Sequence, residues 1–448
     1  MEKVYNYIEL HQKKYLELLQ RFLRQPSVST TGLGMKEMVI LLKETLVEMG
    51  FSIEEIATKG YPIIYGELAG EGRHTLTFYN HYDVQPIDPI EEWEVDPFSG
   101  TIKDGKIISR GAADNKGQLI SRLCAIDAYL KTYGSLPLNI KVIYEGEEEV
   151  GSPHLSYFRK NYPDKLETDG IVWEGGERET KGPAHITLGV KGLTYVELRV
   201  RTANIDAHSC NAPIWPNAVW RLIWALNTLK NEKDEILIDG FYDEVVPPSE
   251  QDIEYLKNIP YNENEILSQM GMKGFINEVT GEELLKKYLY TPTCNICGIK
   301  GGYIEEGIKT VLPSYATAKL DFRLVPNMEC KKIVKLLRKH LDKHGFSDVE
   351  IITMSGQPTF RSDYNNPLVN AAISASTEVY KFPPVIYPTD SGTMGVYQFC
   401  HGTEIPCVMY GVSNRFSQIH APNENIFVED YILGIKMTAA LMDKFSSH

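Results

Sequence analysis

The 448-residue sequence predicts an α/β protein whose mainly parallel sheet is covered by helices and interrupted by a second domain. Short apolar strands alternate with helices before about residue 185, and this pattern returns after about residue 356. Between them, strands alternate apolar and polar residues, as half-exposed antiparallel strands do. We therefore expect an α/β domain made of residues 1–185 and 356–448, with an inserted α+β domain at 186–355.

The first and last parts of the chain justify the three-layer α/β prediction. Helices with apolar residues at helical spacing are expected over Tyr5–Arg24, Met35–Met49, Gly117–Thr132, Pro367–Tyr380 and Val428–Phe445. Apolar strands bounded by turn residues are expected at Phe51–Ile56, Ile63–Leu68, Thr75–Tyr79, Asn139–Tyr144 and Gly170–Trp173. This alternation is typical of a mainly parallel sheet with helices on both faces.

The inserted domain has a different pattern. Strands are expected at Leu193–Arg201, Tyr315–Leu324 and Val349–Thr353, and helices at Asn217–Leu229 and Glu329–Lys343. Residues 231–295 are polar, irregular and locally helical, which suggests a lid segment. The two junctions of this domain with the rest of the chain are candidate hinges.

Composition excludes several classes of partner. Asp and Glu outnumber Lys and Arg, 60 to 46, and the net charge of −14 disfavours nucleic acid. No apolar run approaches the roughly 18 residues of a membrane span, and the first residues have no signal-peptide core. Seven cysteines fit free thiols in a reducing compartment, and Cys294 and Cys297 lack the second pair of a zinc knuckle. We expect a soluble, cytoplasmic protein.

Four chemically active motifs follow predicted strands, at the sheet edge where ligands collect in α/β proteins. They are Asn80-His81-Tyr82-Asp83, Gly111 to Gly117 with Asp114, Glu145 to Glu149, and Gln418 to Asn425 with His420. His81 can bind a metal while Asp83 holds its other ring nitrogen. Like charges at the end of a buried strand are costly unless a cation compensates them, which favours a metal beside Glu145–Glu149.

Each motif also has an ordinary explanation when taken alone. His81 and Asp83 could form a surface pair, and Asp114 could cap the following helix. Glu145–Glu149 could be a solvated acidic run, and His420 could be a structural histidine.

The order of the motifs resembles the family of zinc peptidases that includes carnosine dipeptidases, glutamate carboxypeptidases, aminoacylases and succinyl-diaminopimelate desuccinylases. The resemblance covers nearly the whole chain. Its motifs are Asn80-His81-Tyr82-Asp83-Val84, Trp93 with Asp96-Pro97-Phe98, Asp104-Gly105, Arg110-Gly111 through Lys116-Gly117, Glu148-Glu149 with Gly151-Ser152, Phe322 to Pro326, and His420 to Glu424.

The resemblance implies two divalent metal ions per subunit, most simply zinc, with manganese or cobalt as alternatives. His81 and Glu174 would bind the first ion, Glu149 and His420 the second, and Asp114 both. Five residues with one shared give each metal three protein ligands, and a bridging water makes four. That number suits a catalytic zinc site with an exchangeable position.

The resemblance also implies a mechanism. Glu148 would take the proton of the bridging water and deliver it to the leaving amine. His208, from the inserted domain of the other subunit of a homodimer, would stabilise the oxyanion. Arg323 and Thr310 would bind the terminal carboxylate of the substrate.

The sequence departs from the commonest family pattern in three places. Asn80 stands where Gly is frequent, and Asn115 where Asp is frequent. Asp390 to Thr393 is an atypical version of a glycine-rich substrate loop, with Thr393 as a candidate substrate-binding residue.

We therefore predict a metallopeptidase that cleaves dipeptides or C-terminal residues from small amides with a free carboxylate. The long 231–295 segment favours the dipeptidase branch of the family. An N-acyl amino acid amidohydrolase is the alternative hydrolase, and a non-catalytic metal-binding protein on the same fold is the alternative of another class.

Overall fold

The computed structural model describes residues 1–448 and divides into two compact units. The first unit comprises Met1–Gly189, Arg361–Pro388 and Gln398–His448, and the second comprises Val190–Phe360 and Thr389–Tyr397. The sequence analysis placed the inserted segment at residues 186–355. The short second segment of the second unit, which contains Thr393, was not foreseen, because it is separated from the rest of that unit by a helix and a strand of the first.

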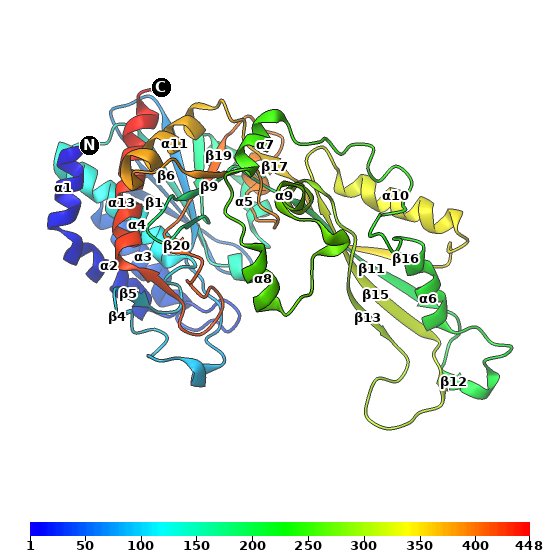
Figure 1. Ribbon diagram of the computed structural model, residues 1–448. Coiled ribbons are helices and arrows are strands. Elements are labelled where there is room, and N and C mark those ends of the chain that lie inside the picture. The colour runs from blue at the N-terminus through cyan, green and yellow to red at the C-terminus, as the bar shows by residue number, and fades with distance from the viewer. The chain divides into compact units, whose positions relative to one another are not determined.

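An eight-stranded sheet forms the centre of the first unit, in the order β1-β2-β6-β3-β7-β19-β9-β18 (Figure 1). The strand β3 runs parallel to its neighbours β6 and β7, whereas β2 is antiparallel to β1 and β6. The sheet is therefore mixed, with parallel pairs at its centre. The strands are β1 Ser52–Ile56, β2 Ile63–Leu68, β6 Asn139–Glu145, β3 Thr75–His81, β7 Gly170–Trp173, β19 Cys407–Met409, β9 His185–Thr187 and β18 Val385–Tyr387.

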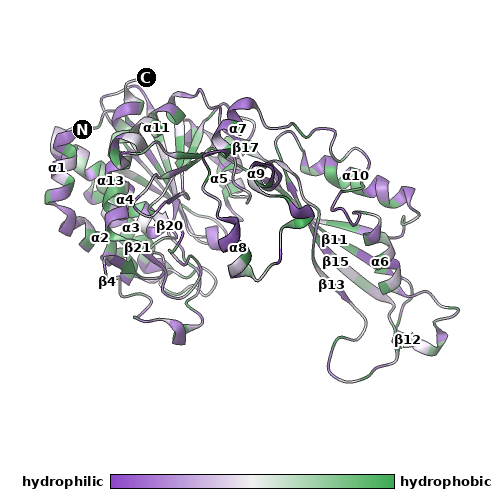
Figure 2. Ribbon diagram, in the orientation of Figure 1, coloured by the Kyte–Doolittle hydropathy of each residue, from purple (hydrophilic) through white to green (hydrophobic).

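Helices cover this sheet on both faces, as the three-layer prediction requires. Successive side chains of a strand point to opposite faces. The Tyr79 ring stacks on Trp173 and meets the edge of Phe399 in α12 (Tyr397–Cys400). The neighbouring side chain, Phe78, instead lies 5.8 Å from the guanidinium of Arg122 in α4 (Lys116–Tyr133). The strands of the sheet are mostly hydrophobic (Figure 2).

The helices expected in the first unit are present, but the first of them is divided, and the short helix α5 (Leu155–Asn161) was not expected. The single helix expected over Tyr5–Arg24 is two helices, because His11 leaves the helical conformation between them. The helices are α1 Glu2–Leu10, α2 Gln12–Arg24, α3 Met35–Glu48, α5 Leu155–Asn161, α11 Pro367–Tyr380 and α13 Val428–Ser446. None of the helices is long and apolar enough to cross a membrane.

A four-stranded antiparallel sheet, in the order β13-β15-β11-β16, forms the second unit with two helices packed against it. The expected strands and helices are present, and β13 is an edge strand that the sequence analysis missed. The 231–295 segment contains three short helices. The elements are β11 Gly192–Arg201, β13 Asn295–Gly301, β15 Tyr315–Leu324, β16 Glu350–Gln357, α6 Ala218–Asn227, α7 Glu250–Leu256, α8 Glu263–Met270, α9 Gly281–Tyr290 and α10 Cys330–Lys343.

Candidate metal centre

The acidic and histidine residues singled out in the first unit lie at one edge of its sheet. His81 is the last residue of β3, Glu174 directly follows β7, and Glu148 and Glu149 follow β6 after a short loop. Because these three strands are neighbours and parallel, their carboxyl ends meet at the same edge. Asp114 precedes α4.

Asp114 lies between the two histidines. Its Oδ1 is 2.9 Å from Nε2 of His81, and its Oδ2 is 3.1 Å from Nε2 of His420. Through the same Nε2 atom each histidine contacts one further carboxylate: Nε2 of His81 lies 2.9 Å from Oε2 of Glu174, and Nε2 of His420 lies 3.1 Å from Oε2 of Glu149. The structure thus brings together all five residues that the sequence analysis nominated as metal ligands.

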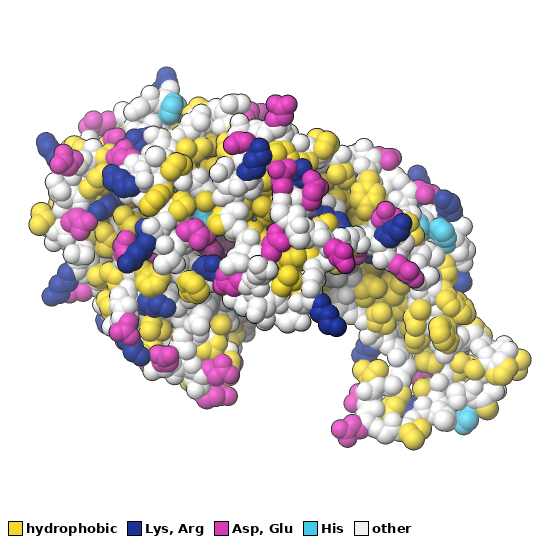
Figure 3. Space-filling view, viewed as in Figure 1, with side chains coloured by type: hydrophobic (Ala, Val, Ile, Leu, Met, Phe, Trp, Pro, Cys, Tyr) yellow, Lys and Arg dark blue, Asp and Glu magenta, His cyan; other side chains and the backbone are white.

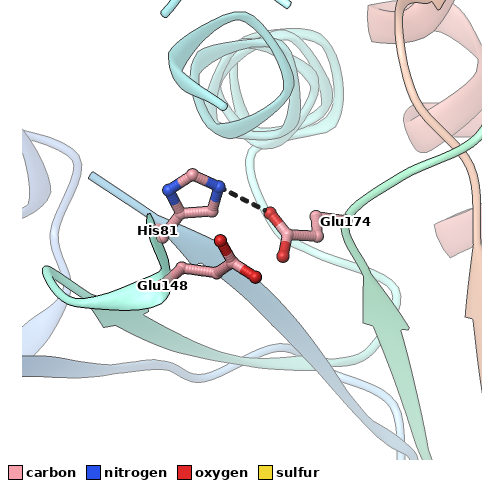
Figure 4. Close-up of side chains that lie close together, drawn as sticks. All are labelled: His81, Glu148 and Glu174. Atoms are coloured by element: carbon pink, nitrogen blue, oxygen red, sulfur yellow. Dashed lines mark ion pairs between the residues drawn. The ribbon is translucent and has the colours of Figure 1, made fainter. Parts of the chain in front are cut away.

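The carboxylate of Glu148 lies beside this group. Ligand atoms of His81, Glu148 and Glu174 all lie within 4.8 Å of one another, and so do those of His81, Asp114 and Glu149. Figure 4 shows the side chains of His81, Glu148 and Glu174 directed toward one another. Glu148 comes from the loop after β6, so it can reach the group without belonging to either histidine–carboxylate pair.

The electrostatics of the cluster favour bound cations. Burial lowers the pKa of His81, but the charge of Glu174 and the hydrogen bond to Asp114 outweigh it, so the pKa is raised. Hydrogen bonds to Asp114 and Glu149 raise the pKa of His420 to about 10. Burial and the charge of Glu174 raise the pKa of Glu148 to about 9. Burial also raises the pKa of Glu174, whereas for Asp114 burial is outweighed by hydrogen bonds to His420 and His81, so the pKa of Asp114 is lowered. A bound cation would supply the positive charge that the buried carboxylates of Glu148 and Glu174 need.

The donor set fits two divalent metal ions. Imidazole nitrogens and carboxylate oxygens are ordinary zinc ligands with bonds of about 2.0–2.2 Å, so one ion can bridge donors up to roughly 4 Å apart. The contacts of 2.9–3.1 Å between donor atoms fall inside that span. Oε1 of Glu149 is buried and has no hydrogen-bond partner, which leaves a free lone pair inside the cluster.

Asp83 organises the site more widely than its sequence position suggested. Nδ1 of His81 lies 3.0 Å from the carbonyl oxygen of Asp83 and 3.3 Å from its Oδ1. The two carboxylate oxygens of Asp83 also accept the backbone N–H groups of Glu148 and Glu149, each at 3.2 Å. One buried carboxylate therefore links the orientation of His81 to the loop that carries both glutamates.

A second buried carboxylate anchors Asp114, and the sequence analysis assigned it no role. Glu424 accepts the backbone N–H groups of Gly111, Ala113 and Asp114 at 2.8–3.1 Å. It also pairs with Arg110 at 2.7 Å, and both side chains are fully buried. In the sequence, Arg110-Gly111 and Asn423-Glu424 belong to two separate motifs. Only the fold shows that Glu424 binds both Arg110 and Gly111.

The ring of Tyr82 lies so close to Gly146, in the loop between β6 and Glu148, that only glycine fits there. A Cβ atom there would lie 2.4 Å from the ring of Tyr82, which is far below van der Waals contact. A larger residue would displace either the Tyr82 ring or the loop carrying Glu148.

The residues nominated in the second unit form two separate groups. Nη1 of Arg323 donates to Oγ1 of Thr393 at 2.8 Å, whereas Thr310 lies 3.3 Å from Nε2 of His208. Ser314, directly before β15, binds the loop that precedes His208 through Asp206, while Arg323 lies at the other end of the strand. Eight residues of strand span roughly 26 Å. Arg323 and Thr310 of one chain therefore do not meet.

Comparison with known families agrees with this arrangement. Residues 77–444 match the profile of Peptidase family M20/M25/M40, which is most of the chain. The chain belongs to this family. The M20 fold, with a catalytic domain and an inserted domain, and the character of a peptidase-type hydrolase are thereby established for it.

Similar proteins of this family are dipeptidases and a carboxypeptidase. The M20 peptidase is 29% identical to human Beta-Ala-His dipeptidase, over 98% of this chain and 92% of the relative. It is 27% identical to the Cys-Gly metallodipeptidase DUG1 of Candida albicans, over 97% and 95%. The crystal structure of the M20 metallo-carboxypeptidase Sso-CP2 from Sulfolobus solfataricus matches with a TM-score of 0.89 and 39% identity, covering 97% and 99%. The two dipeptidases agree with the predicted dipeptidase branch.

Proposed function

We propose that this M20 peptidase is a dinuclear metallopeptidase that hydrolyses dipeptides or releases C-terminal residues. The observation that carries the proposal is the placement of Asp114 between His81 and His420, whose Nε2 atoms each contact one further carboxylate. Two sets of three donors that share one carboxylate match the ligand number of a co-catalytic pair of ions.

In this proposal His81, Asp114 and Glu174 hold one ion, and Asp114, Glu149 and His420 hold the other. Zinc suits the donor set, and manganese and cobalt suit it as well. When bound, the ions polarise the scissile carbonyl and lower the pKa of a water molecule. Asp83 fixes the ring of His81 and the loop of Glu148, so the ligands are oriented before metal arrives.

Glu148 is the proposed general base and acid. Its carboxylate lies within the donor cluster. It takes no part in the histidine–carboxylate contacts that the five proposed ligands make, so it is free to exchange a proton. It accepts a proton from the attacking water on a carboxylate oxygen, and it then donates that proton to the departing amine nitrogen.

The proposed substrates follow from the relatives and from Arg323. The named relatives act on Beta-Ala-His and Cys-Gly dipeptides or as a carboxypeptidase, and these substrates share a free terminal carboxylate. The planar guanidinium of Arg323, held by Thr393, can bind a carboxylate at two points. The seven free cysteines favour a reducing, cytoplasmic location.

A substrate panel tests the proposal. The purified protein, loaded separately with zinc, manganese or cobalt, is incubated with mixed dipeptides, tripeptides, C-terminally amidated dipeptides and N-acetyl amino acids. We expect chelator-sensitive release of free amino acids from peptides with a free carboxylate. Preferential hydrolysis of N-acetyl amino acids would indicate an amidohydrolase instead, and metal binding without any hydrolysis would indicate a non-catalytic protein.

Arg323→Ala should raise KM for dipeptides by about 10- to 100-fold and change kcat less. The reason is that a hydrogen-bonded charge pair contributes about 1.5–3 kcal/mol to binding. Steady-state kinetics measure this, with Arg199→Ala as the control, because Arg199 lies on the same sheet and pairs with Glu197. Amidated dipeptides should show no such difference between the wild type and Arg323→Ala. An equal loss on amidated substrates would exclude carboxylate binding by Arg323.

A homodimer is part of the proposal and is supported by the surface of the second unit. The edge strand β13 is exposed along almost its whole length, including Ile296 and Ile299. On α6, Trp220 and Trp224 are about half exposed and stack on each other. Hydrophobic side chains gather on the visible surface of this region (Figure 3). Unpaired edges and apolar surfaces of this kind are normally covered by a partner.

His208 carries a suitable donor for a site in the partner subunit. Its Nδ1 accepts the backbone N–H of Cys210 at 3.1 Å, so the proton of the neutral ring lies on Nε2. Nε2 contacts Thr310, and both residues are exposed. Since Thr310 lies beside His208 and far from Arg323, the two would enter the partner's site together, where Nε2–H could stabilise an oxyanion.

A mixing experiment tests the shared site. His208→Ala and Glu148→Ala proteins should each be nearly inactive alone. After joint refolding, random pairing makes roughly half of the dimers mixed, each with one complete site, so roughly a quarter of wild-type activity should return. Light scattering establishes the oligomeric state in the same samples. An active monomer, or no recovery in proven mixed dimers, would contradict the shared site.

A further inference from the structure

A fully buried arginine lies next to the metal centre, and its hydrogen-bond acceptors are all carbonyl or amide oxygens. Arg122, in α4, is 1% exposed. Its Nη1 donates to the carbonyl of Tyr79 at 2.6 Å and to Oδ1 of Asn80 at 2.7 Å. Its Nη2 donates to the carbonyls of Trp173 at 2.6 Å and Tyr410 at 3.3 Å. A guanidinium buried without a carboxylate partner is unusual because of its desolvation cost.

The acceptors of Arg122 belong to three adjacent strands. Tyr79 and Asn80 directly precede the last residue of β3, Trp173 ends β7, and Tyr410 directly follows β19, which is the next strand of the sheet. One rigid, planar cation therefore ties the carboxyl ends of three neighbouring strands together. Two of these contacts are made by the residues immediately before the proposed ligands His81 and Glu174.

A second chain of contacts leads from Arg122 to Asp114. Because Arg122 donates to Oδ1 of Asn80, the amide of Asn80 must present its Nδ2 on the other side, where it donates to Oδ1 of Asn115. Asn115 directly follows Asp114. Three of the five proposed ligands thus each have a sequence neighbour in one buried network.

Two residues of this network were noted above as departures from the commonest family pattern. Asn80 and Asn115 are two of the positions at which the sequence departs from the commonest family pattern, with Gly and Asp as the frequent residues. Here the two departures contact each other, and both depend on the orientation that Arg122 imposes on Asn80. Asn80 and Asn115 therefore belong to the same hydrogen-bonded network.

We propose that Arg122, Asn80 and Asn115 form a positioning network that holds His81, Glu174 and Asp114 ready to bind metal. This inference rests on the proposed metallopeptidase function. The side chains of Arg122 and Asn80 are buried, so they act through the strand ends and the ligands. Substitution of residues that orient metal ligands without binding the metal typically lowers metal affinity by about 10- to 100-fold.

The test compares Arg122→Met with Arg178→Met. Arg178 is also a buried arginine of the first unit, but it pairs with Asp430 at 2.5 Å and contacts no neighbour of a proposed ligand. Both variants should have a lower apo-protein melting temperature. Only Arg122→Met should bind zinc about 10- to 100-fold more weakly, measured by competition with a chromophoric chelator. The visible spectrum of its cobalt form should also change.

Asn80→Ala provides a second variant, which decides the question if Arg122→Met does not fold. It removes the link to Asn115 and leaves the carbonyl contacts of Arg122 in place, so a smaller loss of zinc affinity is expected. Zinc affinity within about threefold of wild type in the folded variants, together with lower melting temperatures, would overturn the inference. If the wild type itself neither binds two ions nor hydrolyses peptides, the proposed function fails instead.

Discussion

Glu148→Gln is expected to lower kcat by about 10²- to 10⁴-fold while both metal ions remain bound. The amide has nearly the same shape as the carboxylate but cannot accept a proton from water or return one to the leaving amine. Glu148 lies within 4.8 Å of ligand atoms of His81 and Glu174, so it is close enough to act on a water held there. Steady-state kinetics and metal analysis of the same preparation measure the two quantities.

The matched control for this variant is Glu147→Gln. Glu147 is the preceding residue of the same acidic run, but its carboxylate pairs with His154 at 2.6 Å instead of facing the proposed ligands. Its substitution should leave kcat within a fewfold of wild type. Near-normal turnover of a metal-loaded Glu148→Gln protein would show that another group is the base. Loss of metal from this variant would assign Glu148 to the ligands.

Removal of metal is expected to abolish hydrolysis, by about 10³-fold or more. A catalytic ion contributes several kcal/mol to the stabilisation of developing charge, and each 1.36 kcal/mol is a factor of ten. Dialysis against a chelator followed by addition of zinc, manganese or cobalt should remove and then restore activity. The loaded protein should also unfold at a higher temperature, because metal binds the folded state preferentially.

Asp114→Ala tests the shared position of this carboxylate. Since Asp114 contacts both histidines, the variant should lose affinity for both ions, whereas Glu174→Ala should mainly affect the ion beside His81. Metal titration with stoichiometry distinguishes these outcomes. Retention of two tightly bound ions by Asp114→Ala would show that the ligands are divided differently.

Much of the candidate site could be predicted because its residues follow strands. An apolar run that ends in His81 or in Glu145 places the next polar side chains at the sheet edge, whatever the details of packing. The five proposed ligands came from the resemblance to a known family, and the structure places them together. These are local signals combined with a known motif order.

Contacts between distant segments could not be predicted in the same way. Nothing near Arg122 in the sequence indicates that it bonds to the ends of three strands, because its partners are between 42 and 288 residues away. The pairing of Glu424 with the backbone before α4 is hidden for the same reason. No Pro or Gly marks the break between α1 and α2 at His11, so the helical spacing of apolar residues predicted one continuous helix there.

The dependence of Asp114 on Glu424 and His420 has a consequence for biosynthesis. A growing chain has made His81, Asp114, Glu149 and Glu174 long before it makes the two residues near its other end. Until then Asp114 lacks both its backbone anchor and its second histidine. We expect nascent or C-terminally truncated chains to bind at most one ion weakly, so that complete loading follows release from the ribosome.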